Sequence, residues 1–256
     1  MSSDSESGSD STTEEQNVEP TAVVIGAGPA GLSAAVFVAR AGFETIVVED
    51  GTSILRRNAH LENFLGFPAG VNSRLLLEMG REQAERSGAE FVRADVEAVE
   101  RDGDGFSVQT DDETHEADYV VVASWADASI VDSLDLETTQ QGSKTYVETE
   151  DGRTTVEGLY VAGRIAGQPH QSIVNAGHGA KVALSMIHDS DVPFYHDWVA
   201  PEGYFTGRGR DIPPGCEEIT EEERKEREKK SLELMRGYFE EAHPEEPTLH
   251  PSQRDG

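Results

Sequence analysis

The sequence predicts an α/β fold, with a parallel β-sheet flanked by helices, a β-meander and a helical C-terminal arm. Three observations predict it. Apolar runs alternate with helical patterns early in the chain, short runs separated by acidic, glycine-containing turns follow, and a strongly charged helical stretch lies near the end. Alternating strands and helices are typical of parallel sheets, and closely spaced strands with turns between them are typical of meanders.

The first strand, helix and second strand are joined by a glycine-rich turn. An apolar strand over 22–26 breaks into Gly26-x-Gly28-x-x-Gly31, and a helix over 29–41 and a strand over 44–49 follow. Such glycines permit the turn, let the backbone approach a pyrophosphate, and bring helix and strand together. Glu49 has the spacing of an acid that hydrogen-bonds an adenosine ribose. This predicts a Rossmann-like dinucleotide site without distinguishing FAD from NAD; the alternative is a unit that binds no nucleotide.

The remaining elements follow from hydrophobic periodicity and turn residues. The strands 96–100, 106–110 and 119–123 are expected to form the meander. Further elements are predicted as helices over 73–87 and 172–187 and as strands over 90–93, 145–147 and 159–162.

We expect three parts in the chain. Residues 1–19 are acidic and polar, which predicts a disordered tail, and residues 20–190 form the nucleotide-binding domain. Residues 191–256 form the arm, which begins with a segment rich in proline, glycine and aromatic residues. Thr220 and Glu223 have the spacing of a capping box, which predicts a helix over about 221–242.

The composition is strongly acidic: 50 Asp and Glu oppose 21 Lys and Arg, for a net charge of −29. This balance argues against binding to nucleic acid or anionic membranes. Charge spread along the whole chain favours a halophilic protein, with an ordinary acidic protein as the alternative. No apolar stretch is long enough to span a bilayer and no signal peptide is evident, so we expect a cytoplasmic protein.

The sequence indicates neither a metal site nor a catalytic residue. The eight histidines lack ligand-pair spacing, and no Gly-x-Ser-x-Gly motif is present. The single cysteine, Cys216, excludes an internal disulfide and a Cys-x-x-Cys pair.

Several separated blocks resemble the FAD-binding part of the thioredoxin reductase family, among the pyridine nucleotide-disulfide oxidoreductases. They are the glycine turn with Glu49, the segment 62–68 (Glu-Asn-Phe-Leu-Gly-Phe-Pro), Asp95-Val96, and the segment 158–163 (Gly-Leu-Tyr-Val-Ala-Gly) followed by Gln171 and a helix. The resemblance implies FAD as the cofactor and residues 20–190 as the FAD-binding domain. The residues that it and the glycine turn place at the cofactor are Gly26, Gly28, Pro29, Ala30, Gly31, Glu49, Asp50, Asn63, Val96, Gly163, Arg164, His170, Gln171 and Ser172.

The chain also departs from the family pattern. The family carries an NAD(P)H-binding domain with a Cys-x-x-Cys pair between the meander and the last flavin motif, whereas only a short stretch separates Ala123 from Tyr160 here. We therefore expect no disulfide reductase chemistry. Arg164 replaces the usual aspartate that binds a ribityl hydroxyl. It has the donors to bind the pyrophosphate instead; the alternatives are weak flavin binding or another adenine nucleotide.

Two further positions bear on the cofactor pocket. Arg56-Arg57-Asn58 stands where the family has Gly-Gly-Gln beside the flavin ring. Trp125 either caps the pocket or fills space left by the missing domain, and we favour the second interpretation.

Three functions are compatible with the sequence. The first is a flavin-dependent oxidoreductase reduced by free NAD(P)H or by a redox partner protein. The second is a non-catalytic FAD- or nucleotide-binding module, and the third is an interaction protein that has lost the flavin. We favour the first, although fold resemblance predicts the cofactor better than the chemistry.

Overall fold

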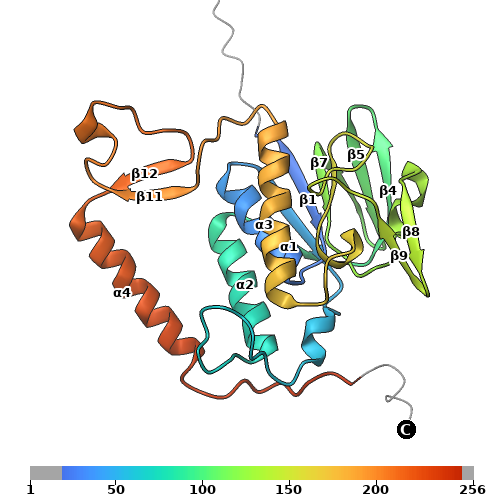
Figure 1. Cartoon of the computed structure of the whole chain (residues 1–256), viewed down its shortest axis with the longest axis horizontal. Coiled ribbons are helices and arrows are strands. Elements are labelled where there is room, and N and C mark those ends of the chain that lie inside the picture. The colour runs from blue at the N-terminus through green and yellow to red at the C-terminus, as the bar shows by residue number, and fades with distance from the viewer. Residues whose placement is uncertain (1–18, 250–256) are drawn as a thin grey trace, which may run out of the picture.

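The computed structural model describes residues 19–249, so the predicted disordered tail, residues 1–19, lies outside the described residues except for Glu19 (Figure 1). The centre of the folded body is a five-stranded parallel sheet in the order β10-β7-β1-β2-β3. The strands are β1 (Thr21–Ile25), β2 (Glu44–Glu49), β3 (Glu90–Arg93), β7 (Tyr119–Val122) and β10 (Leu159–Val161). The predicted α/β fold with a parallel sheet is confirmed.

Helices cover one face of this sheet and the meander covers the other (Figure 1). Ala22 and Val24 of β1 pack against the helices, whereas Val23 and Ile25 pack against the meander. This alternation follows from the two-residue period of a strand. The helices are α1 (Pro29–Arg40), α2 (Ser73–Ser87) and α3 (Ser172–Asp189), and the meander strands are β4 (Val96–Asp102), β5 (Gly105–Thr110) and β6 (Thr114–Ala117).

The predicted third strand of the meander, 119–123, was wrong. That stretch is β7, which lies in the parallel sheet between β1 and β10, and the meander closes with β6 instead. A run of consecutive apolar residues is typical of a strand buried on both faces, and Val120, Val121 and Val122 are all completely buried. The sequence of β6, Thr-His-Glu-Ala, is too polar to be distinguished from the turn before it.

Four elements between β7 and α3 complete this part of the chain. The 3₁₀ helix η2 (Ser129–Leu134) follows β7, and the hairpin of β8 (Thr138–Gln141) and β9 (Lys144–Val147) comes next. Of the hairpin strands, only β9 was predicted. The 3₁₀ helix η3 (Gly163–Ala166) then connects β10 to α3.

The described part of the arm contacts the body near β11 and again after α4. Strands β11 (Trp198–Pro201) and β12 (Cys216–Ile219) pair in parallel, with the 3₁₀ helix η4 (Thr206–Arg208) between them, and an Arg40–Asp197 ion pair of 2.5 Å ties this part to α1. Helix α4 (Glu221–Tyr238) begins at Thr220, whose side chain accepts a hydrogen bond from the Glu223 backbone as the capping box predicts.

Helix α4 ends at Tyr238, four residues before the predicted end. Gly237 weakens the helix at this point. Beyond it the chain turns to follow α2, where the Tyr238 hydroxyl donates to Glu82 and the His243 ring contacts Glu78 at 2.8 Å. Among residues 19–249, no helix is long and apolar enough to cross a membrane.

Candidate functional site

A cavity of about 460 Å³ opens where β1, β2 and β7 end. In open parallel sheets, ligands bind at the carboxyl ends of the strands, and this volume is typical of small-molecule sites. Ile25 and Glu49 from the ends of β1 and β2, and Ala123 just after β7, are part of its wall. The connection between each strand and the next element supplies most of the remaining wall.

The three glycines of the first turn have different structural roles. Gly26 has a φ of +102°, which favours glycine. A Cβ at Gly31 would lie 1.8 Å from the Gly26 carbonyl oxygen, so residue 31 must be glycine for α1 to pack this closely. A Cβ at Gly28 would meet only the Ser53 Oγ atom, at 3.7 Å. Because Gly28 lines the cavity, a side chain there would project into space that a ligand would otherwise fill.

Two helices begin at this cavity, and neither has a side-chain cap. Helix α1 starts after Gly28 and α3 starts after Gln171, and neither of these residues caps its helix through its side chain. By contrast, Asn72 and Thr220 cap α2 and α4, which begin elsewhere. Uncapped helix N-termini leave backbone N–H donors free and carry partial positive charge, which suits an anionic group such as a pyrophosphate.

One end of the cavity is acidic. Glu49 is held by Arg81 of α2, whose Nη1 atom lies 3.1 Å from the carboxylate. Asp50 accepts hydrogen bonds from the backbone and hydroxyl of Thr52, which shapes the turn after β2. Val96 lies on the same wall. A fixed carboxylate at the end of the second strand can accept hydrogen bonds from ribose hydroxyls.

The other end combines aromatic and cationic side chains. Arg164 donates to the Tyr146 hydroxyl at 2.8 Å and to the Gln168 carbonyl, and its guanidinium lies 5.5 Å from the centre of the Trp125 ring. Trp125 also contacts the ring of His170, with 5.2 Å between centroids. Trp125 therefore forms part of the cavity wall, which favours the first of its two interpretations over the one preferred from the sequence.

Two histidines near this end have lowered pKa values. For His170 the causes are partial burial, then the positive charges of Arg164 and Lys144, and both work against protonation. Burial also lowers the pKa of His178, with Lys181 adding to the effect. The Nδ1 atom of His178 accepts a hydrogen bond of 3.0 Å from the Gly163 backbone, so its remaining proton is on Nε2.

The structure gathers most of the predicted site residues at the cavity but not all of them. Those in its wall are Gly26, Gly28, Pro29, Ala30, Glu49, Asp50, Val96, Arg164, His170 and Ser172. Gly31 and Gly163 instead support the packing of α1 and α3, because a Cβ at Gly163 would lie 2.7 Å from Ala30 Cβ. Asn63 and Gln171 lie outside the wall and are hydrogen-bonded to each other at 2.8 Å.

Other wall residues were not predicted. They come from the segment after β2 (Thr52, Ser53, Ile54, Leu55) and from the segment after β7 (Ser124, Asp127, Ser129, Ile130), with Asn175 from α3; Arg57, which the resemblance put beside the flavin ring, is also in the wall. The rule that ligands bind at the carboxyl ends of parallel strands could have indicated the segment after β7, had that strand been assigned to the sheet.

Some polar groups in the cavity wall are not satisfied within the described part of the protein. Within residues 19–249, no group of three or more His, Cys, Asp or Glu side chains is arranged to bind a metal. Two buried polar atoms of wall residues, Arg164 Nε and Asn175 Oδ1, have no hydrogen-bond partner among the described residues. Buried polar atoms without a partner are rare, and their position fits a site completed by a polar ligand.

Comparisons with known proteins match two stretches of the chain. A family model described as "FAD binding domain" matches residues 21–60, and one described as "Pyridine nucleotide-disulphide oxidoreductase" matches residues 75–180. The thioredoxin reductase of Mycolicibacterium smegmatis is 39% identical over 109 residues, which is 41% of this chain and 35% of that protein. This chain is thioredoxin reductase-like.

A second relative and a solved structure show how much of the chain is matched. The thioredoxin reductase of Aquifex aeolicus (strain VF5) is 39% identical over 107 residues, covering 41% of this thioredoxin reductase-like chain and 33% of that protein. The chain thus spans about a third of the length of these curated relatives. A solved thioredoxin reductase structure from Gloeobacter violaceus superposes with a TM-score of 0.60 at 16% identity, over 70% of this chain and 99% of that chain, and supports the fold.

The two family matches thus liken residues 21–60 to FAD-binding domains and residues 75–180 to pyridine nucleotide-disulphide oxidoreductases, in a chain that holds one cysteine. Neither family match reaches the arm beyond residue 190.

Proposed function

We propose that the chain binds FAD non-covalently in this cavity and acts as a flavin-dependent oxidoreductase. The observation that carries the proposal is the meeting of two uncapped helix N-termini, those of α1 and α3, at one cavity. Gly28 is open to the same space, so the backbone can approach a pyrophosphate there. When bound, FAD would supply the capacity to accept and pass on electrons.

The arrangement suggests a role for each end of the cavity. Glu49 would bind the adenosine ribose, with Arg81 holding its carboxylate in place, and Val96 would lie at the adenine. Ser172, at the start of α3, would lie at the flavin end, where partial positive charge stabilises electron density on the reduced ring. Asn63 and Gln171 would approach the ring from the rim.

Arg164 is better suited to shaping the wall than to binding phosphate. Its two terminal nitrogens already donate to Tyr146 and to the Gln168 carbonyl. Turning the whole guanidinium toward a pyrophosphate would require these contacts to break, whereas Nε and the second hydrogen of each terminal nitrogen keep their capacity to donate. We therefore favour the N-terminus of α1, rather than Arg164, as the pyrophosphate site.

The proposed chemistry does not include disulfide reduction. Cys216 is the single cysteine of the chain, so no dithiol pair can form within it. Cys216 lies in β12 of the arm, where its thiol faces the His196 carbonyl at 3.4 Å, and it is not part of the cavity wall. We propose that electrons come from free NAD(P)H or from a redox partner protein.

The visible spectrum of the purified chain tests the proposal. A flavin spectrum, with FAD released on denaturation, is the expected result. A colourless preparation that also takes up no added FAD in molar salt would leave an interaction protein as the better explanation. Bound FAD that no donor can reduce would instead favour a non-catalytic FAD-binding module.

A further inference from the structure

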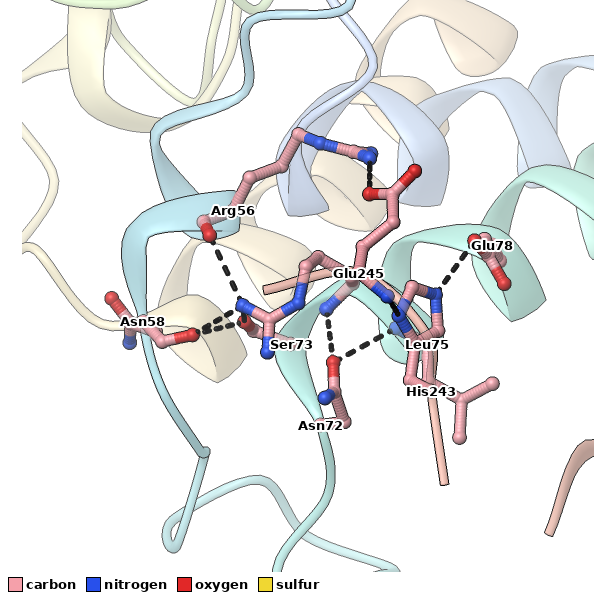
Figure 2. A network of polar contacts seen from close by, with 9 residues as sticks. Arg56, Asn58, Asn72, Ser73, Leu75, Glu78, His243 and Glu245 are labelled. Atoms are coloured by element: carbon pink, nitrogen blue, oxygen red, sulfur yellow. Dashed lines mark hydrogen bonds and ion pairs between the residues drawn. The ribbon is translucent and has the colours of Figure 1, made fainter. Parts of the chain in front are cut away.

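The 3₁₀ helix η1 (Ile54–Arg57) forms one side of the cavity, and its residues face two ways. Ile54, Leu55 and Arg57 are part of the cavity wall. The Arg56 side chain is not part of the wall and points toward Glu245, with which its guanidinium forms an ion pair (Figure 2). The position of this wall therefore depends on the contacts that η1 and the residues after it make on the side away from the cavity.

A buried arginine holds this loop from within the body. Arg74, at the start of α2, is only 1% exposed, and it donates to the carbonyl oxygens of Arg56 at 3.1 Å, Asn58 at 2.7 Å and Ala59 at 3.4 Å. Buried guanidinium groups are costly unless their donors find acceptors. Three carbonyl groups of the loop thus accept hydrogen bonds from one buried side chain, which fixes the inner face of the loop.

The C-terminal strap, which we define as residues 239–249, holds the same loop from outside. The Thr248 backbone donates to the Arg56 carbonyl oxygen at 3.1 Å, and Glu245 pairs with the Arg56 guanidinium. The strap is itself anchored to α2, because the His243 Nε2 atom lies 2.8 Å from Glu78 and the His243 side chain is 3% exposed (Figure 2). Backbone and side chain of Arg56 are therefore both held by the strap.

The strap also contacts the segment that carries Asn63. The ring of Phe239 lies 6.3 Å from that of Phe67, and Phe67 packs with Leu61 and Val71, which pair with each other across the base of this loop. The two segments that the resemblance places beside the flavin, residues 56–58 and 62–68, thus both contact the same piece of chain.

We propose that the C-terminal strap is a positioning element of the cofactor cavity, acting through Glu245 and Thr248 on Arg56. The proposal rests on the proposed function, because it takes FAD as the occupant of the cavity. It gives the arm a role in cofactor binding even though the described residues of the strap are not part of the cavity wall.

We expect variants of the strap to weaken FAD binding moderately. The Glu245 and Arg56 side chains are 52% and 26% exposed, and a partly exposed ion pair contributes little when it is merely neutralised. Charge reversal in Glu245→Arg places two guanidinium groups together and is expected to push the strap off the loop. Thr248→Pro removes the N–H that donates to the Arg56 carbonyl. We expect each variant to raise the Kd for FAD about fivefold.

The test uses the full chain, with Glu228→Arg beside Arg224 on α4 as the matched control, since it reverses a charge in a similar ion pair that does not touch the loop. FAD affinity is measured by fluorescence titration, and amide hydrogen exchange of residues 54–60 is measured without cofactor. Weaker binding and faster exchange in Glu245→Arg and Thr248→Pro, unchanged behaviour of the control, and recovery in the double variant Arg56→Glu/Glu245→Arg are the expected results.

The two readouts separate this proposal from the proposed function. A parent chain that binds no FAD contradicts the proposed function, while the exchange of residues 54–60 still tests the strap. Unchanged exchange and unchanged affinity in both strap variants would overturn the strap proposal even if the parent binds FAD tightly.

Discussion

The Asn63 Nδ2 atom donates to Gln171 Oε1 at 2.8 Å, joining two side chains that are 108 positions apart in the sequence. The contact connects the loop before α2 to the start of α3 at the rim of the cavity. Each side chain was expected at the flavin ring, and the structure shows that they are also partners of each other.

Because they are partners, we expect Asn63 and Gln171 to act as a unit in FAD binding. Asn63→Ala and Gln171→Ala should each raise the Kd for FAD about threefold to tenfold, and the double variant should cost little more than either single change. A double-mutant cycle measured by flavin fluorescence titration tests this. Fully additive effects would show that the two side chains contribute independently.

Gly28→Val should abolish FAD binding and leave the fold intact. A side chain at Gly28 meets only Ser53 Oγ at 3.7 Å in the protein, so its main effect would be on a ligand. Gly31→Ala is the contrasting variant, because its Cβ would lie 1.8 Å from a backbone oxygen and should destabilise the fold. Circular dichroism melts and FAD titrations on both variants check the distinction. Normal FAD binding by Gly28→Val would refute the assignment of this turn.

Glu49→Ala should weaken FAD binding without abolishing it. A hydrogen bond to a charged group contributes about 1.5 to 3 kcal/mol, so the Kd should rise between about 10- and 150-fold. Arg81→Met removes the partner of this carboxylate rather than the carboxylate itself and should have a smaller effect. Titration calorimetry with FAD measures both. An effect of Arg81→Met larger than that of Glu49→Ala would contradict the ribose assignment.

Electron entry should distinguish an oxidoreductase from a module that only holds the cofactor. The sequence has no second Gly-x-Gly-x-x-Gly motif, so free NADH and NADPH should reduce the flavin slowly and without saturation, whereas a protein donor should reduce it quickly. Dithiols should be inert, because Cys216 has no second cysteine to pair with. Anaerobic stopped-flow measurements with NADH, NADPH and reduced ferredoxin show which donor reduces the flavin and how fast. Fast, saturable reduction by a nicotinamide would reveal a binding site absent from this interpretation.

Thermal stability should rise as potassium chloride increases from millimolar to molar. The chain has a net charge of −29, and the Debye length falls from about 10 Å at 0.1 M to about 3 Å at 1 M salt. Screening therefore relieves repulsion among the acidic side chains. Melting curves across this range test the prediction, with sucrose as an uncharged control. A constant midpoint in salt would favour an ordinary acidic protein.

Local sequence determined the part of the site that depends on short-range structure. The glycine turn is encoded by three closely spaced positions, and the strand before it and the helix after it are recognisable from periodicity alone. Glu49 follows because it ends the next strand. The start of the helix after Thr220 was predictable from its capping box, and the helix that begins at Ser172 from hydrophobic periodicity.

The sequence-based predictions were wrong where the partner of a strand depends on pairing between distant segments. Residues 119–122 look like a meander strand beside two similar strands, yet they join β1 and β10 in the parallel sheet, because only there are both faces of the Val-Val-Val run covered. Most of the wall segment after β7 was missed as a consequence, and Trp125 within it was assigned to the space left by the missing domain rather than to the cavity wall. Strand partners depend on the whole packed sheet and not on the strand alone.

By itself, then, the sequence determined the fold class, the glycine turn and the acid that ends the second strand, because each depends on residues close together along the chain. Only the tertiary structure decided that Asn63 meets Gln171, that Arg164 turns to Tyr146, and that the C-terminal strap holds the loop at Arg56. These contacts join distant segments. Their formation depends on how the sheet, helices and arm pack together, and no local pattern of residues specifies that packing.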